Sequence, residues 1–135
     1  MPVLQLYASF SIISPVLEDI IAGIELFNNA DFFSAHDFFE DLWVESKRDE
    51  KLFFQGLVQI SVGCYHLICG NYKGASSQLN KGKTKLRSYL PSYKNLDLKK
   101  LLTEIELLLL DLNKSFSESN YKVDISKLPK LIVLL

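Results

Sequence analysis

The sequence has few of the residues that crosslink or interrupt a fold. Its 135 residues include two cysteines, four prolines and six glycines. Cys64 and Cys69 match no CxxC redox or zinc motif and lie in an apolar run. We therefore expect two buried thiols in a reducing compartment, and so a cytoplasmic protein. The first thirteen residues contain no Lys or Arg, which argues against a secretory signal peptide.

Several catalytic motifs are also absent. The chain has no phosphate-binding loop, no GxSxG nucleophile elbow and no dinucleotide fingerprint. No nucleophile–base pair is recognisable, so covalent catalysis has no support and enzyme activity stays an open question. Residues 52–72 carry no Asp, Glu, Lys or Arg and are long enough to span a bilayer. We reject a membrane span because this stretch holds three glycines and several polar residues, and a buried central helix fits better.

The dominant pattern in the sequence is helical periodicity of its apolar residues. The composition, 48% hydrophobic and 23% charged with a net charge of −1, is that of one globular domain. Apolar residues recur every three or four positions. They predict an all-α soluble fold of about five helices: two tetratricopeptide-like antiparallel hairpins and a closing C-terminal helix. The expected helices begin at Ser14-Pro15 and then cover about residues 32–46, 51–69, 71–90 and 97–117.

This pattern divides the chain into an N-terminal arm (1–13), a helical domain (14–117) and a C-terminal tail (118–135). In the last helix, the residues expected to face the core are Leu98, Leu101, Leu102, Ile105, Leu108, Leu109, Leu112 and Phe116. The tail ends in the apolar run Leu131 to Leu135. It could pack back on the domain, form a strand or meet a partner.

A weak internal repeat supports the two hairpins. Asp31 to Ala35 aligns with Asn71 to Ala75 at an offset of 40 residues. Each segment opens a helix with a capping residue, an aromatic residue and then a small residue. We therefore expect two similar hairpins packed side by side.

Charge is distributed unevenly along the chain. Residues 1–50 have a net charge of −8 and residues 51–100 a net charge of +8. The two halves either neutralise each other on packing or give the molecule a large dipole moment. The predicted helix 71–90 carries the basic run Lys73, Lys81, Lys83, Lys85 and Arg87. A solvated face meeting the acidic half explains this run better than a nucleic-acid surface, because no aromatic residues are interleaved with the cations.

His36 is the first candidate functional residue. At 100° per residue, its side chain lies on the apolar face of the predicted helix 32–46, near Phe39 and Trp43. Glu40 follows one turn later at the edge of that face, so the two side chains are neighbours. The polar residues Ser34, Asp37, Asp41 and Glu45 fall on the opposite side. Trp43 is expected in the core, with pocket lining as the alternative.

The central helix carries a second polar stripe. Three polar residues and two glycines share one face: Gln55, Gln59, His66, Gly56 and Gly63. The simplest packing sets this stripe against the helix 32–46, with the glycines leaving room for Phe39 and Trp43. We then expect one partly buried cluster of His36, Glu40, Gln59 and His66.

Three interpretations of this cluster stay open. It can be a satisfied hydrogen-bond network that fixes helix register. It can be a metal-free polar pocket, or a site for a divalent metal such as zinc or iron, held by His36, Glu40 and His66. The HExxH spacing that would make a zinc assignment specific is missing.

The sequence resembles a family known as domain of unknown function 309. The segments that carry the resemblance are Phe27-Asn28, Phe33 to His36, Glu40 to Trp43, Phe54 to Gln59, Tyr65-His66 and Gly70 to Tyr72. They match in order and spacing over about residues 20–110. The resemblance implies a small multihelical bundle of bacteria or plastids, hence a cytoplasmic or stromal location, and no particular activity. The positions matching the family's motif are His36, Glu40, Trp43, Gln59, His66 and Asn71; Val44 stands where an Arg is common.

Two function hypotheses follow. In the first, a pocket formed by His, Glu and Gln side chains binds a metal or small ligand, with Gln55 and Asn71 as further candidate contacts. In the second, the cluster is only structural and the protein is a non-enzymatic interaction module. Its hairpins and apolar tails would then bind another protein or a second copy of the chain.

Overall fold

The computed structural model describes residues 15–135, and side chains from residue 19 onward. The described residues form five α-helices, which confirms the all-α prediction: α2 (Pro15–Asn28), α3 (Phe32–Glu45), α4 (Arg48–Ile68), α5 (Tyr72–Leu86) and α6 (Leu98–Ser117). The expected cap at Ser14 and the arm 1–13 lie outside the described residues. None of the described helices is both long and apolar enough to cross a membrane.

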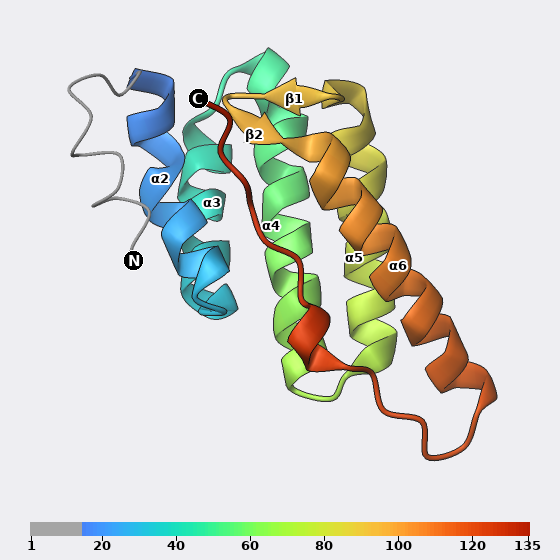
Figure 1. Ribbon diagram of the computed structural model, residues 1–135. Coiled ribbons are helices and arrows are strands. Elements are labelled where there is room, and N and C mark those ends of the chain that lie inside the picture. The colour runs from blue at the N-terminus through green and yellow to red at the C-terminus, as the bar shows by residue number, and fades with distance from the viewer. Residues whose placement is uncertain (1–14) are drawn as a thin grey trace.

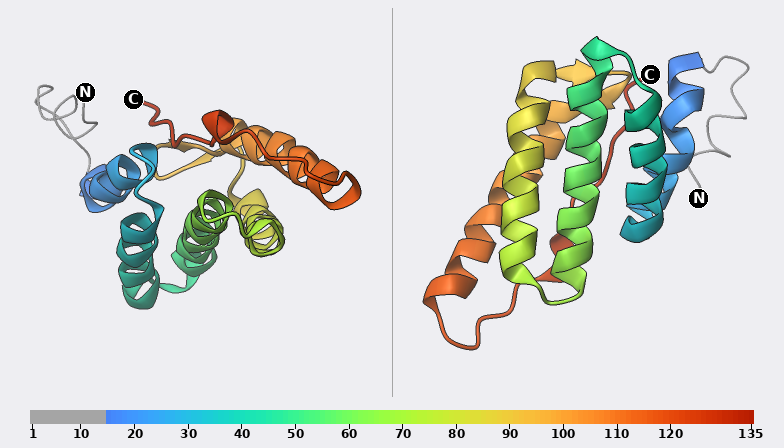
Figure 2. Two further views of the ribbon diagram at one scale, coloured as in Figure 1. Left: turned by 90° about the horizontal axis from the view of Figure 1, so that it is seen from below. Right: turned by 180° about the vertical axis from the view of Figure 1, so that it is seen from behind.

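The helices form two layers around α4. Helices α3, α4 and α5 lie side by side, while α2, the C-terminal segment and α6 cover the other face (Figure 1; Figure 2). Four phenylalanines, at most 2% exposed, occupy the space between the helices: Phe27, Phe32, Phe39 and Phe53. Burial of these apolar rings is the main force that holds the short helices together.

The two hairpin turns have the same backbone geometry. Ala30 and Gly70, 40 residues apart, both have a positive φ, at 61° and 79°. The next residue caps the following helix in each case: Asp31 Oδ1 accepts from the Ser34 amide and Asn71 Oδ1 from the Gly74 amide. The internal repeat therefore corresponds to a repeated helix–turn–helix unit, in which each cap satisfies an amide left unpaired at a helix start.

A short hairpin, which the helical pattern did not predict, joins α5 to α6. After the 3-10 turn Arg87–Tyr89, strands β1 (Ser92–Tyr93) and β2 (Leu96–Asp97) pair antiparallel. Lys94 and Asn95 between them both have a positive φ, as a tight two-residue hairpin turn requires. Asp97 then caps α6 by accepting from the Lys100 amide at 3.0 Å.

The C-terminal segment packs back on the helices. It contains the 3-10 turn η2 (Ile125–Lys127), and it then runs between α2 and α6 toward β2 (Figure 1). Val133 forms a bridge with Leu96, and Leu131 is 2% exposed. Of the three courses left open for this tail, the structure has the first, with one strand-like bridge.

Two details of the predicted packing were wrong. Phe116 is 54% exposed rather than in the core, because the last turn of α6 diverges from α5 (Figure 2). Gly56 and Gly63 face α5 rather than α3: a Cβ on them would lie 2.8 Å from Leu86 Cγ and Leu79 Cγ, respectively. The glycines thus allow close approach of α4 and α5. The space beside them is occupied by Leu86 and Leu79 of α5 rather than by Phe39 or Trp43.

Candidate metal site on α3

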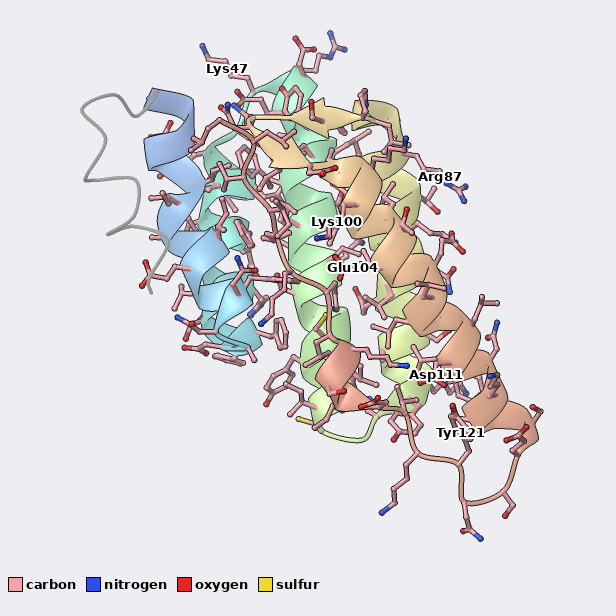
Figure 3. The ribbon with its side chains drawn as sticks, viewed as in Figure 1. Lys47, Arg87, Lys100, Glu104, Asp111 and Tyr121 are labelled. Atoms are coloured by element: carbon pink, nitrogen blue, oxygen red, sulfur yellow. The ribbon has the colours of Figure 1, made fainter. Side chains whose placement is uncertain are left out.

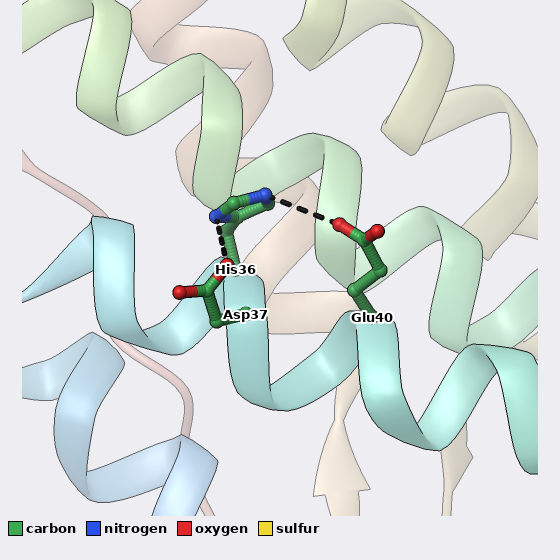
Figure 4. A group of neighbouring side chains, drawn as sticks. All are labelled: His36, Asp37 and Glu40. Atoms are coloured by element: carbon green, nitrogen blue, oxygen red, sulfur yellow. Dashed lines mark ion pairs between the residues drawn. The ribbon is translucent and has the colours of Figure 1, made fainter.

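Helix α3 brings one imidazole and two carboxylates together near its N-terminal half. His36 Nε2 lies 3.2 Å from Glu40 Oε2, and His36 Nδ1 lies 3.3 Å from Asp37 Oδ1 (Figure 4). The side chain of His36 is 23% exposed, so water reaches the group. One ligand atom from each of the three residues lies within 4.8 Å of the others, a grouping able to hold a metal ion.

Both ring nitrogens of His36 face acceptors. Nδ1 is 3.0 Å from the carbonyl oxygen of Phe33, which can only accept a hydrogen bond, so Nδ1 carries a proton. The lone pair of a neutral ring would then point from Nε2 at the Glu40 carboxylate, an unfavourable arrangement of two acceptors. It becomes favourable when Nε2 also carries a proton or when a cation lies between Nε2 and Glu40.

The spacing of Nε2 and Glu40 suits a chelated ion. Zinc bonds of about 2.1 Å to nitrogen and oxygen, meeting at a tetrahedral angle, place the two ligand atoms about 3.4 Å apart. Asp37 lies at the other ring nitrogen, where a carboxylate fixes the orientation of a ligating imidazole. An ion bound here would have two protein ligands, with Asp37 as an orienting carboxylate and the remaining coordination positions open to water or a small ligand.

His66 lies outside this group of described residues. A series of ring contacts leads from His36 to Phe33, then to Tyr65 and His66, with centroid distances of 5.4, 5.6 and 6.3 Å. His66 Nδ1 instead lies 3.4 Å from Asn71 Nδ2, and the His66 carbonyl accepts from the Asn71 amide. The geometry therefore ties His66 and Asn71 to the turn that opens α5.

The two glutamines of the predicted stripe on α4 lie on the outer side of that helix, unlike its glycines. Tyr65 faces α3 while Gly56 and Gly63 face α5, so the positions of Gln55 and Gln59 fall between these two directions. Both glutamines are partly buried, and Gln59 Oε1 is buried without a hydrogen-bond partner. Among the predicted site residues, Gln59 is the one whose buried side-chain oxygen has no hydrogen-bond partner in the part of the chain that the structure describes.

Trp43 is partly buried against the core and its carbonyl accepts from Ser46 Oγ and Lys51 Nζ. Cys69, expected in the core, is exposed because it lies at the end of α4, where the chain turns. A hydrogen bond with Cys69 raises the pKa of the Tyr65 hydroxyl. Cys64 is buried as expected, and burial raises the pKa of its thiol.

The basic run on α5 is partly neutralised by α6. Lys83 Nζ lies 2.7 Å from Glu106 Oε1, and Arg87 lies 3.7 Å from the same oxygen. These contacts come from the C-terminal third of the chain rather than from its acidic first half. Lys94 makes the cross-half pair, 2.8 Å from Glu50.

Residues 20–78 match a family model described as Domain of unknown function (DUF309). The resemblance to DUF309 is confirmed. The match takes in most of α2, all of α3 and α4 and the start of α5, and so the candidate metal and pocket residues from His36 to Asn71. Its continuation to about residue 110 stays a prediction. No curated protein matches the chain.

Within this DUF309 region, the sequence identified His36 and Glu40 but missed Asp37. A helical wheel places Asp37 100° from His36, which suggested the solvent side. The side chain nevertheless reaches the neighbouring ring at 3.3 Å, because adjacent residues at the edge of a helix face can bend toward each other. The run His-Asp-x-x-Glu is the signal that could have indicated this group.

Proposed function

We propose that the protein binds a divalent transition-metal ion through His36 Nε2 and the Glu40 carboxylate. Asp37 and the Phe33 carbonyl hold the ring, and the open coordination positions take water or a small ligand. The observation that carries the proposal is the close approach of Nε2 to Glu40 while Nδ1 is already committed to an acceptor. A carboxylate and an imidazole favour zinc, iron or a similar ion over calcium.

The proposal has a pH signature with a definite sign. Metal competes with protons for Nε2 and for the Glu40 carboxylate, so binding releases protons and weakens as the pH falls. Without metal, a proton on Nε2 satisfies the same geometry. Acid therefore favours the metal-free state.

The test is equilibrium dialysis of untagged protein against Zn²⁺, with Co²⁺ absorption as a spectroscopic readout. We expect about one ion per chain, His36→Ala to abolish binding, and Glu40→Gln to weaken it at least tenfold. Asp37→Asn should weaken binding by about 10-fold, the usual effect of losing an orienting carboxylate. Asp41→Asn, which removes an exposed acid from the same helix, is the matched control and should leave binding unchanged.

His66→Ala separates this site from a shared His36–His66 site. Retained binding supports the α3 site, whereas equal loss in His36→Ala and His66→Ala would show that both imidazoles ligate and that the two-ligand arrangement is wrong. No metal uptake by the unaltered protein would leave the alternative: a structural hydrogen-bond network in an interaction module. His36→Ala would then lower the melting temperature without any effect on metal.

A further inference from the structure

Helix α6 presents an apolar strip to solvent beside a groove. Leu107 and Leu110 are 63% and 60% exposed, high values for leucines in a folded domain. They lie on one wall of a groove of about 710 Å³, whose other wall is the C-terminal segment with Leu128. The groove lies far along the chain from the His36 cluster and shares no residue with it.

Some charged side chains along this groove have no partner among the described side chains. Asp111 accepts a hydrogen bond from the Tyr121 hydroxyl, and Asp124 accepts from Ser126. In contrast, among the described side chains, those of residues 19–135, Glu104 Oε1 is buried without a hydrogen-bond partner, and neither Glu104 nor Lys114 forms an ion pair. Figure 3 shows Glu104 and Asp111 following one another along α6. An unpaired buried acceptor is costly, so a cation supplied from outside would stabilise this site.

Glu104 and Lys114 cannot satisfy each other in one chain. They are ten residues apart on α6, or about 15 Å along the axis. Two copies of α6 packed antiparallel about a two-fold axis could pair Glu104 with Lys114, because a two-fold contact uses the same patch on both partners. With the axis near residue 109, Glu104 of each copy meets Lys114 of the other.

The same register brings the apolar residues together. Leu107 and Leu110 flank the axis on opposite sides, so Leu107 of one copy lies beside Leu110 of the other. Lys100, exposed one turn before Glu104, then meets Glu118 of the second copy. A leucine centre with complementary charges at both ends is the usual pattern of a specific helix–helix contact.

From these contacts we infer that the α6 groove binds a second copy of this chain, in an antiparallel two-fold dimer with reciprocal Glu104–Lys114 pairs. The exposed apolar area is small, so the dimer is weak and depends on protein concentration. Its formation does not depend on metal at His36, and either proposal can fail without the other.

Charge reversal with rescue tests the dimer. Sedimentation equilibrium of the full chain, in reducing agent to prevent disulfides through the exposed Cys69, measures the dissociation constant. We expect Glu104→Lys and Lys114→Glu each to weaken dimerisation by about tenfold or more. The double variant carries both reversed charges and should restore it, which only reciprocal pairing between copies explains. Lys73→Glu, a charge reversal at an exposed position of α5, is the control and should have no effect on dimerisation.

Circular dichroism confirms that each variant is folded before its dissociation constant is compared. A chain that stays monomeric at millimolar concentration overturns the inference. A dimer that ignores the single reversals, or that the double variant fails to restore, also overturns it, because the contact would then use another face. A mixture of Glu104→Lys and Lys114→Glu chains should form a stronger dimer than either variant alone, because both contacts of the mixed pair join a Lys with a Glu, whereas each variant paired with itself joins like charges. A mixture that dimerises no more strongly than either variant alone overturns the inference.

Discussion

Single glycines decide how closely the two central helices approach each other. A Cβ on Gly82 of α5 would lie 2.9 Å from the Gly56 carbonyl oxygen of α4 and 2.6 Å from Ile60 Cδ1. The carbonyl belongs to the backbone of a buried helix and cannot rotate away. The small residues of α5 therefore set the distance between α4 and α5, as in other close helix pairs.

Gly82→Ala should destabilise the fold. Because the clash involves a backbone oxygen, it should cost about 2–3 kcal/mol, the upper part of the usual range, and the better helix propensity of alanine returns about 1 kcal/mol. We expect a net loss of about 1–2 kcal/mol in the free energy of unfolding, measured by urea denaturation. Ser77→Ala on the exposed side of α5 is the control and should change stability by less than about 0.5 kcal/mol. An equally stable Gly82→Ala protein would show that α4 and α5 pack less tightly than described.

At the scale of elements, one side chain of α2 forms two hydrogen bonds with the backbone of the C-terminal segment. Asn28 Nδ2 donates to the Leu131 carbonyl and Asn28 Oδ1 accepts from the Leu131 amide, both at 2.8 Å. The Asn28 carbonyl also accepts from Lys130 Nζ at 2.6 Å. An amide side chain thus pairs with the extended chain much as a neighbouring strand would, which gives a role to the Phe27-Asn28 motif.

Asn28→Ala should loosen this segment selectively. The Leu131 amide and carbonyl lose their partners, at a cost of about 1–3 kcal/mol. We expect faster amide hydrogen exchange in residues 128–134 while the amides of α4 keep their protection. Asn113→Ala, an exposed position on α6, should leave exchange unchanged. Unaltered exchange at Leu131 in the Asn28→Ala protein would mean that the other contacts of the segment, which include the Val133–Leu96 bridge and the burial of Leu131, hold it without Asn28.

For the whole molecule, the reactivity of the two cysteines distinguishes the core from the surface. Cys64 is buried at the centre of the bundle, where burial raises the pKa of its thiol, while Cys69 is exposed. Reaction with a thiol reagent needs both access and the thiolate. Cys64 therefore becomes reactive only when the bundle opens as a unit.

We expect one fast-reacting thiol per native chain and a second that appears on unfolding. In Cys69→Ser no thiol should react quickly with an aromatic disulfide reagent, whereas Cys64→Ser should keep the fast phase. The slow phase should accelerate with urea, because it follows the opening of the core. Two fast thiols, or a fast thiol in Cys69→Ser, would contradict the described burial of Cys64.

The local features of this protein could be predicted from its residues. The helices, the caps at Asp31 and Asn71, and the neighbouring pair His36 and Glu40 depend on interactions within about four residues. Such interactions repeat with the helical period and are visible in the chain itself. Asp37 was missed because a wheel fixes the direction of a Cβ but not the bend of the side chain beyond it.

Which surfaces meet was decided only by the tertiary structure. The glycine stripe of α4 indicated a close neighbour but not whether that neighbour was α3 or α5. The sequence also did not indicate where residues 118–135 pack. The hydrogen bonds between Asn28 and Leu131 connect residues about a hundred positions apart in the chain. An apolar face in the sequence shows that it must be buried. It does not show against which partner, because burial of apolar surface is non-directional and the partner depends on how all the helices pack into one core.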